Sequence, residues 1–171
     1  VKDRRVERRP RRIKYPIIQG CMQWFATADL AAAVSNAGGL GVISSATFAS
    51  PEDLRAEIKR CRTLTDKPFA VNISLFPSLN AVGYHEHIKV CAEEGVRIME
   101  TAGRAPTEYI EEMKAAGITV IHKCVAVKHA LKAQSIGCDM VVIDGYEAAG
   151  HIGAFNTGTM VLTPSAVRAL S

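Results

Sequence analysis

The sequence is poor in long apolar runs, in paired cysteines and in aromatic residues, and each shortage excludes a class of protein. No apolar stretch approaches the roughly 20 residues of a membrane-spanning helix, so no membrane partner is expected. The single tryptophan and four tyrosines form no stripe on which single-stranded nucleic acid could stack. Five cysteines occur without a CxxC pair or a Cys/His cluster, so neither a disulfide framework nor a zinc site is expected. Unpaired cysteines indicate a reducing compartment, and we expect a cytoplasmic protein without a metal.

Several common catalytic and nucleotide-binding motifs are also missing. The chain contains no GxSxG nucleophile elbow, no P-loop and no GxGxxG segment that opens a helix after the first strand. The glycine cluster Gly38-Gly39-Leu40-Gly41 precedes an apolar stretch, which makes it the end of a helix and not a dinucleotide-binding loop. These absences argue against α/β-hydrolase, P-loop and Rossmann chemistry.

The positive charge of the chain lies at its N-terminus. The net charge is +4, but residues 1–14 carry eight Lys or Arg against Asp3 and Glu7, which gives +6. Residues 15–171 therefore carry −2. No apolar core follows the basic segment, so it is not a secretory signal. We expect residues 1–14 to be a solvated basic extension of a single domain; such a segment can bind nucleic acid or an anionic membrane, but neither partner is expected here.

Apolar and helical segments alternate along the rest of the chain. Six short apolar segments are typical of buried strands: Tyr15–Gln19, Leu40–Ser44, Pro68–Ile73, Val96–Glu100, Ile118–His122 and Asp139–Ile143. Helices are expected at Thr27–Ala37, Ser50–Leu64, Tyr84–Glu94, Pro106–Ala116 and Val125–Ile136, with a last helix opened by Thr163-Pro164. Thr27 is expected to cap the first helix, and Pro51 to occupy the first turn of the second.

This alternation predicts an α/β fold with parallel strands, because each helix returns the chain to the edge where the previous strand began. A doubly wound sheet and a (β/α)8 barrel share the pattern, but the short helices and the repeat of about 25 residues favour the barrel. A complete barrel needs about 250 residues. The chain should therefore be a TIM-barrel-type parallel (β/α) repeat with about six of eight units, truncated or incomplete. Its open edge strands could pair with another copy in a homo-oligomer.

Reactive groups in either architecture lie just beyond the carboxyl ends of the strands. This rule selects Cys21–Gln23, Ser44–Ser45, Asn72, Glu100–Thr101, His122–Lys123 and Asp144–Gly158. The last loop is the most informative, because small residues at 148–150 let the backbone approach a flat ligand. His151, between Gly150 and Gly153, is presented on a compact loop. A neutral imidazole there can take a proton from a carbon acid, or it can satisfy a buried loop carbonyl.

The remaining candidates each carry a structural alternative. Lys123 could hold negative charge on a bound ring, or pair with Glu100 or Asp144. Asn72, at the end of a buried strand, could bond a ligand or a neighbouring backbone group. Successive side chains of a strand point to opposite faces, so His122 is expected to point away from Lys123, into the packing layer. Three histidines in helical stretches are expected at the surface: His85, His87 and His129.

At these residues the sequence resembles the nitronate monooxygenase (formerly 2-nitropropane dioxygenase) family of FMN-dependent TIM barrels. The resemblance runs from about Tyr15 to Ser171. Its most specific part is Asp144-Gly-Tyr-Glu-Ala-Ala-Gly-His-Ile-Gly153, which is similar to the segment around the family's catalytic histidine. The other matching segments are Tyr15-Pro-Ile-Ile-Gln-Gly-Cys-Met-Gln-Trp24, Ala37-Gly-Gly-Leu-Gly-Val-Ile43, Phe69-Ala-Val-Asn-Ile73, Val96-Arg-Ile-Met-Glu-Thr-Ala-Gly103 and Val120-Ile-His-Lys-Cys124.

The resemblance implies that residues 15–171 are part of an FMN-binding barrel whose activity is the oxidation of alkyl nitronates or nitroalkanes with molecular oxygen. His151 would be the general base that removes the acidic α-proton of a nitroalkane. The residues implied to line FMN are Met22, Gln23, Asn72, Lys123, Asp144, Ala149 and Gly150. The two further units of the family barrel, which are not among the six counted here, carry the loops that hold phosphate in such barrels.

Two alternatives stay open. A flavin-type enoyl-[acyl carrier protein] reductase has a similar histidine loop and would consume a reduced nicotinamide cofactor. The Pro77-Ser-Leu-Asn80 segment and the Lys123-Cys124 pair favour the nitronate-oxidising branch. The alternative from a different class is a non-catalytic half-barrel that oligomerises through its open edges.

Overall fold

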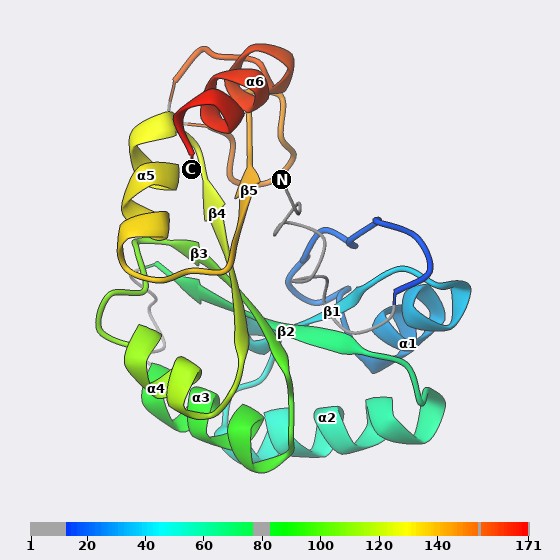
Figure 1. Ribbon diagram of the computed structural model, residues 1–171. Helices are drawn as coiled ribbons and strands as arrows, with labels where there is room; N and C mark the ends of the chain where they lie inside the picture. Colours follow the sequence, from blue (N-terminus) through cyan, green and yellow to red (C-terminus); the bar gives the residue numbers. More distant parts are fainter. Residues whose placement is uncertain (1–12, 77–82, 154, 171) are drawn as a thin grey trace, which may run out of the picture. The chain divides into compact units, whose positions relative to one another are not determined.

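The computed structural model describes residues 13–76, 83–153 and 155–170, and helices alternate with strands along them (Figure 1). The strands are β1 (Gly41–Ser44), β2 (Phe69–Leu75), β3 (Ile98–Gly103), β4 (Thr119–Cys124) and β5 (Met140–Ile143). The helices are α1 (Ala28–Ala37), α2 (Pro51–Leu64), α3 (Tyr84–Glu93), α4 (Ile110–Ala115), α5 (Val127–Ser135) and α6 (Thr159–Ala169), with a 3-10 turn η1 at Ser45–Thr47. Residues 1–12 of the basic extension and the Pro77–Asn80 segment lie outside the described residues.

The strands follow one another in a single sheet in chain order, β1-β2-β3-β4-β5. β1 pairs with β2 in parallel, from Gly41 beside Phe69 to Ser44 beside Asn72. β4 pairs with β5 in parallel, from Ile121 beside Met140 to Cys124 beside Ile143. The predicted α/β fold with a partial TIM-barrel-type repeat is confirmed. The described residues divide into two compact units, the first made of 13–72 and 83–98 and the second of 73–76 and 99–170 without 154.

The strand predicted at Tyr15–Gln19 is reduced to one parallel bridge, between Ile18 and Leu40. Pro16 has no N–H to give to a ladder, and Ile17 N donates locally to Tyr15 O at 2.8 Å. The backbone bonds that join this segment to Leu40 are Leu40 N to Ile17 O and Gln19 N to Leu40 O, at 2.9 and 3.0 Å. The prediction of a full strand was therefore wrong, although the segment does pair in parallel with Leu40, the residue before β1.

In the first unit, the ends of the helices follow the expected signals with one exception. Ser50 caps α2 by accepting from Asp53 N at 3.1 Å, and Pro51 opens the helix as predicted. Gly38 ends α1 with a φ of 101°, a left-handed conformation that glycine adopts without strain. Thr27 occupies the N-cap of α1, but its side chain makes no capping bond. Glu57 of α2 takes that place by accepting from Ala28 N at 2.6 Å.

The core of the first unit brings α1 very close to β1. Ser35 Oγ accepts from Gly41 N at 3.1 Å and donates to Pro68 O at 2.9 Å, which joins the helix to the starts of β1 and β2. A Cβ built on Gly41 would overlap the backbone of Ala31, and both residues are fully buried. α2 and α3 lie side by side (Figure 1), joined by Arg55, whose guanidinium contacts Glu93 and Glu94 at 2.6 and 2.7 Å.

In the second unit, the inner faces of α5 and β5 pack together. Cys124, Ala130 and Ala133 are buried, and Cys138, Val141, Ile143 and Leu170 pack against them. Asp139 fixes the start of β5, because its carboxylate accepts from Val120 N at 2.8 Å and pairs with Lys114 at 2.6 Å. These contacts join the start of β5 to the start of β4 and to α4.

Helix α6 begins earlier than the sequence predicted. The expected start was Thr163-Pro164, but the helix starts at Thr159, and Pro164 lies inside it. Glu147 explains the difference, because its Oε1 accepts from Thr159 N at 2.7 Å and satisfies one of the free amides of the first turn. Hydrogen bonds from its own backbone N–H, from Thr159 N–H and from the Thr159 hydroxyl lower the pKa of the Glu147 carboxyl.

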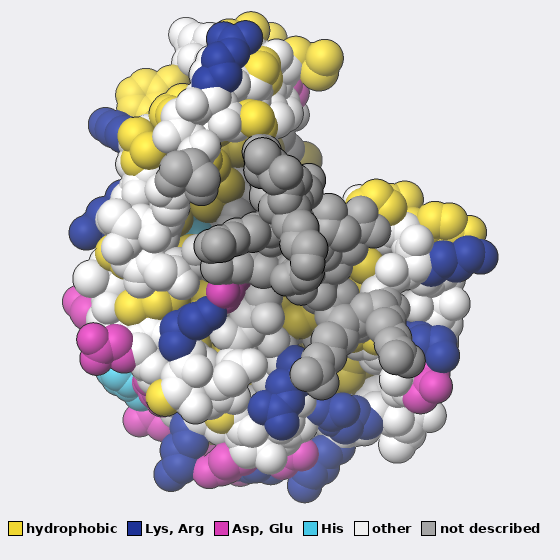
Figure 2. Space-filling model, viewed as in Figure 1, with side chains coloured by type: hydrophobic (Ala, Val, Ile, Leu, Met, Phe, Trp, Pro, Cys, Tyr) yellow, Lys and Arg dark blue, Asp and Glu magenta, His cyan; other side chains and the backbone are white. Residues whose placement is uncertain are grey.

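Part of the surface over α6 is apolar. Met160, Val161 and Val167 are exposed, and Figure 2 shows hydrophobic side chains on the part of the surface that carries α5 and α6. None of the helices in the described ranges combines the length and the apolar character that crossing a bilayer requires.

The close approach of α1 and β1 can be tested with Gly41→Ala. The added methyl group has to displace the Ala31 backbone, so we expect a loss of about 1–3 kcal/mol in the free energy of unfolding, measured by urea denaturation. Gly20→Ala is the control, because a Cβ there meets nothing within 4 Å; its change should stay within about 0.5 kcal/mol. Equal stability of Gly41→Ala and the unmodified protein would contradict the packing described.

The Glu147 contact can be tested with Glu147→Gln, which removes the charge and keeps an acceptor oxygen. Because the folded pKa of Glu147 is lowered, its stabilisation is complete above the ordinary glutamate range and is lost as the pH falls through the folded pKa. We expect Thr159 N–H to show a lower hydrogen-exchange protection factor in Glu147→Gln than in the unmodified protein at pH 7. The difference should vanish once the pH is below the folded pKa. Glu108→Gln, an exposed glutamate paired with Arg104, should leave this amide unchanged.

Candidate functional site

The loop that joins β5 to α6 is tied at its base to the start of the helix. Gly145 N donates to Thr159 Oγ1 at 3.1 Å, and Thr159 N donates to Glu147 Oε1 at 2.7 Å, so the two segments exchange hydrogen bonds. Tyr146 N donates to Thr157 O at 3.1 Å, and Gly153 N to Gly145 O at 3.3 Å. The base of the loop is therefore closed, and its middle, residues 148–152, projects from the carboxyl end of β5.

His151 lies in this projecting part and is exposed. Its imidazole stacks on the ring of Phe76, with 4.7 Å between the centroids and 14° between the planes. Phe76 directly follows β2, so the contact joins the carboxyl ends of two strands within the second unit. An exposed, stacked ring fits proton transfer with a ligand better than it fits the alternative role of satisfying a buried carbonyl.

Lys123, at the end of β4, pairs with Glu100 of β3, and 3.7 Å separates Nζ from Oε1. The Glu100 side chain is 3% exposed and that of Lys123 is 21% exposed, so the cation compensates a nearly buried carboxylate. The sequence left open a pair with Glu100 or with Asp144, and the structure has the pair with Glu100. A lysine ammonium has three N–H donors, so this pair leaves it able to contact a ligand as well.

His122 lies in the packing layer, as predicted. It is buried, and its Nδ1 lies 2.9 Å from Thr101 Oγ1. Burial lowers the pKa of His122, a hydrogen bond with the Thr101 backbone opposes the shift, and nearby His129 acts in the same direction as burial. Burial also raises the pKa of the neighbouring Cys124 thiol to about 12, so this cysteine is no nucleophile at neutral pH.

The first unit holds three of the residues that the resemblance implied for FMN. Met22 and Gln23 are exposed in the loop after Ile18, and Gln23 Nε2 donates to Ala46 O at 2.8 Å. Asn72 is buried and lies beside Ser44 in the register of β1 and β2. The loop thus lies against the turn that follows β1, at the same strand ends as Asn72.

Three more of these residues lie in the histidine loop of the second unit. Asp144 is half-buried, and its N–H donates to Cys124 O at 2.9 Å. Ala149 and Gly150 are exposed. Gly150 has a φ of 78°, and a Cβ built on it would meet nothing within 4 Å. The open backbone at these two residues fits the close approach of a flat ring such as a flavin.

One histidine prediction was wrong. His85 is exposed and His129 half-buried, but His87 is buried, and burial lowers its pKa. His87 precedes Cys91 by one helical turn, on the face of α3 that also buries Ile88. The spacing of His87, Ile88 and Cys91 along the helix was visible in the sequence and could have predicted that His87 is buried.

Phe76, Glu147 and Thr159 are the site residues that the sequence did not reveal. The predicted third strand ended at Ile73, whereas β2 continues to Leu75 and carries Phe76 to the strand end. Phenylalanine has no chemical signature that would mark it as a partner for a histidine 75 positions later in the sequence. Glu147 lies within the family-like loop segment, but no spacing rule connects it to Thr159.

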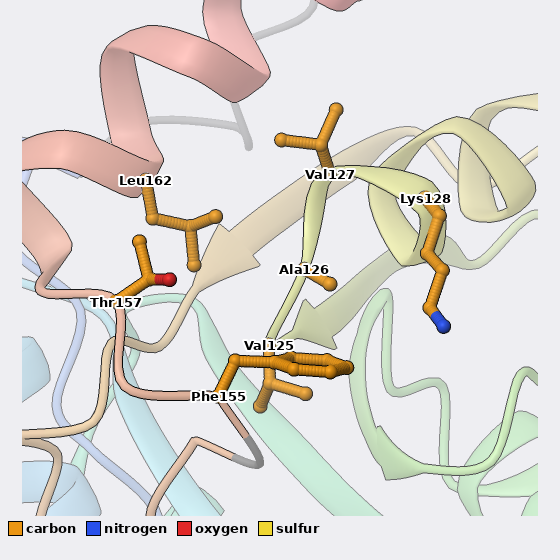
Figure 3. A pocket seen from close by; sticks show the side chains of 7 residues that line it. All are labelled: Val125, Ala126, Val127, Lys128, Phe155, Thr157 and Leu162. Atoms are coloured by element: carbon orange, nitrogen blue, oxygen red, sulfur yellow. The ribbon is translucent and has the colours of Figure 1, made fainter.

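A small cavity of about 290 Å³ lies beside the histidine loop in the second unit. Figure 3 shows the side chains that line it, which come from the residues before and at the start of α5, from the end of the β5–α6 loop and from α6: Val125, Ala126, Val127, Lys128, Phe155, Thr157 and Leu162. Most of the lining is apolar, and Lys128 Nζ lies 5.4 Å from the centre of the Phe155 ring. Among the described residues, no group of three or more His, Cys, Asp or Glu side chains could hold a metal ion.

Comparisons with known proteins show which family the chain belongs to. The family model described as nitronate monooxygenase matches residues 9–171. A relative from Rhodococcus jostii is 39% identical over 92% of this chain and 43% of its own length. It is named (3aS,4S,5R,7aS)-5-hydroxy-7a-methyl-1-oxo-octahydro-1H-indene-4-carboxyl-CoA dehydrogenase. A probable nitronate monooxygenase of Staphylococcus saprophyticus is 34% identical over 89% of this chain and 52% of its own length.

Among solved structures, FabK from Thermotoga maritima superimposes with a TM-score of 0.85 and 40% sequence identity, over 93% of this chain and 49% of that one. The chain thus spans about half the length of the relatives it matches. Members of this family are, in general, flavin-dependent oxidoreductases. The match of the family model over nearly the whole sequence, including the histidine loop, shows that the chain belongs to the nitronate monooxygenase family.

Proposed function

We propose that the protein is an FMN-dependent oxidoreductase in which His151 is the general base toward a carbon acid. The observation that supports this most directly is the position of the imidazole. It is exposed on a loop at the carboxyl end of β5 and stacked on Phe76. Family membership makes the carboxyl ends of the strands the expected place for the flavin and the substrate.

Residues in each unit fit a role in holding FMN. In the second unit these are the open backbone of Ala149 and Gly150 and the side chain of Asp144, which directly follows β5. The Lys123 ammonium, near the end of β4, is a further candidate. In the first unit they are Met22 and Gln23 of the exposed loop, and Asn72. When bound, FMN would supply the redox chemistry, accepting electrons from the substrate and passing them to molecular oxygen.

The proton step is carried by the chain itself. A neutral imidazole nitrogen of His151 accepts the proton from the carbon next to the electron-withdrawing group. The C–H bond breaks, an N–H bond forms, and the electron pair delocalises into that group. For a nitroalkane the product is the nitronate. The Lys123 ammonium, held by Glu100 in the second unit, is a candidate for stabilising negative charge on the bound ring system.

Two substrate classes present such a proton. We favour nitroalkanes and their nitronates, which is consistent with the family description and with the relative named as a probable nitronate monooxygenase. The second candidate is a thioester, because the Rhodococcus relative is named as a dehydrogenase of a carboxyl-CoA. A thioester also carries a proton on the carbon next to its carbonyl, so the same histidine would serve either class.

The role of His151 can be tested with His151→Ala in the full-length, flavin-loaded protein. A preformed nitronate has already lost its α-proton, so only the neutral nitroalkane needs a base. We expect kcat/KM for nitroethane to fall by about 10²–10⁴-fold, the usual contribution of a general base, with little change for ethyl nitronate. Steady-state oxygen consumption measures both rates.

The control is His85→Ala, which removes an exposed histidine from α3 in the first unit and should change neither rate. Equal losses on nitroethane and on its nitronate would rule out the proposed role of His151. The substrate class has a separate test: flavin reduction by a saturated acyl thioester, without turnover of nitronate, would favour the thioester candidate, whereas oxidation of a reduced nicotinamide in the presence of an enoyl thioester would favour the enoyl reductase alternative.

A further inference from the structure

The position of Phe76 points to a function beyond packing. Phe76 is 39% exposed, yet its ring stacks on the His151 imidazole with 4.7 Å between the centroids. We propose that Phe76 is a positioning residue that sets the plane of the His151 ring for proton transfer. This inference rests on the proposed role of His151 as the general base.

The loop backbone by itself leaves the ring of His151 weakly oriented. The backbone bonds described above close the base of the loop at Gly145, Tyr146 and Gly153. His151 lies above this base and follows Gly150, whose φ of 78° places it in a region where few side chains are found. An exposed side chain on such a loop samples several rotamers unless a neighbour selects one. The Phe76 ring is that neighbour.

Phe76 itself has a defined place at the strand ends. Leu75, the residue before it, accepts from Arg104 N at 3.4 Å. Gly103, at the end of β3, has a φ of 84°, and a Cβ built on it would lie 3.0 Å from Leu75 O and 3.2 Å from Phe76 Cδ2. The missing side chain at Gly103 thus leaves room for the Phe76 ring. Phe76, which follows β2 and lies beside Gly103 of β3, is the residue against which the His151 ring stacks.

The stacked geometry suits a base. A stacked ring covers one face of the imidazole and leaves its ring nitrogens at the edge, where a substrate proton can be reached. When His151 accepts the proton it becomes a cation, and the π-face of Phe76 attracts a cation more than a neutral ring. Phe76 should therefore favour the step that charges His151. Oxidation of a preformed nitronate contains no such step and should be insensitive to Phe76.

The experiment compares Phe76→Leu, which keeps an apolar side chain of similar size, with Phe76→Tyr, which keeps the aromatic face. Both are made in the full-length, flavin-loaded protein. The first readout is NMR of the imidazole C–H protons of His151, identified by their loss in His151→Ala. In the unmodified protein the ring current of Phe76 shifts these signals. Phe76→Leu should move them, and Phe76→Tyr should keep them near their original positions.

The second readout is kinetic. Phe76→Leu should lower kcat/KM for nitroethane by roughly 2- to 12-fold, the range expected from an aromatic pair, and leave ethyl nitronate unchanged. Phe76→Tyr should keep the rate of the unmodified protein on both substrates. Added to His151→Ala, Phe76→Leu should cause no further loss, because a residue that acts through His151 has no effect without it. Phe76→Met serves as a second variant if Phe76→Leu folds poorly.

Each contrary result has a separate meaning. Unmoved His151 signals in Phe76→Leu, or equal losses on the two substrates, would overturn the inference on Phe76 and leave the role of His151 standing. A further loss when Phe76→Leu is added to His151→Ala would also overturn it. If His151→Ala keeps its full rate on nitroethane, the proposed function itself fails, and the positioning role fails with it.

Discussion

The exchange of hydrogen bonds between Thr159 and the loop after β5 is the constraint on which the candidate site depends. Thr159 gives its backbone N–H to Glu147 and receives the N–H of Gly145 on its hydroxyl, at 2.7 and 3.1 Å. One residue thus begins a helix and closes a loop. Without it, a loop rich in glycine and alanine would lose conformational entropy on ordering with little to offset the cost. With it, the free amides at the helix start are partly satisfied, and His151 projects from a closed base.

Parallel strands explain why residues distant in the sequence meet at this site. The carboxyl ends of β2, β3 and β5 carry Phe76, Gly103 and His151, and each is the last residue of its strand or lies in the loop that follows. The strand interiors are used differently. Thr101 and His122 satisfy one another inside the packing layer, and a buried, neutral histidine there stabilises the sheet without taking part in chemistry. The same residue type therefore lies in opposite environments at positions 122 and 151: His122 is buried in the packing layer and His151 is exposed on a loop.

The sequence predicted the order of the elements well, because their signals are local. Pro51 opens α2 and Gly38 ends α1, since each residue restricts or permits particular backbone angles regardless of its surroundings. The His151 loop was found from its composition and its resemblance to a family. What failed depended on tertiary contacts. Glu57 replaced Thr27 as the cap of α1, Glu147 moved the start of α6 away from Pro164, and packing of α3 buried His87. Phe76 could not be identified, because its importance comes from a stack between two loops.

An exposed imidazole makes different demands for the two substrate classes. A nitro group makes the neighbouring C–H far more acidic than a thioester carbonyl does, so a histidine can remove that proton without further stabilisation of the carbanion by the protein. A thioester needs hydrogen-bond donors aimed at its carbonyl oxygen to stabilise the charge that develops there. The backbone N–H groups of the histidine loop are natural candidates for such donors, but those of Gly145, Tyr146 and Gly153 are already used to close its base. A thioester would therefore have to draw such donors from the rest of the loop, whereas a nitroalkane needs none from it, and this difference in demand is what separates the two substrate classes physically.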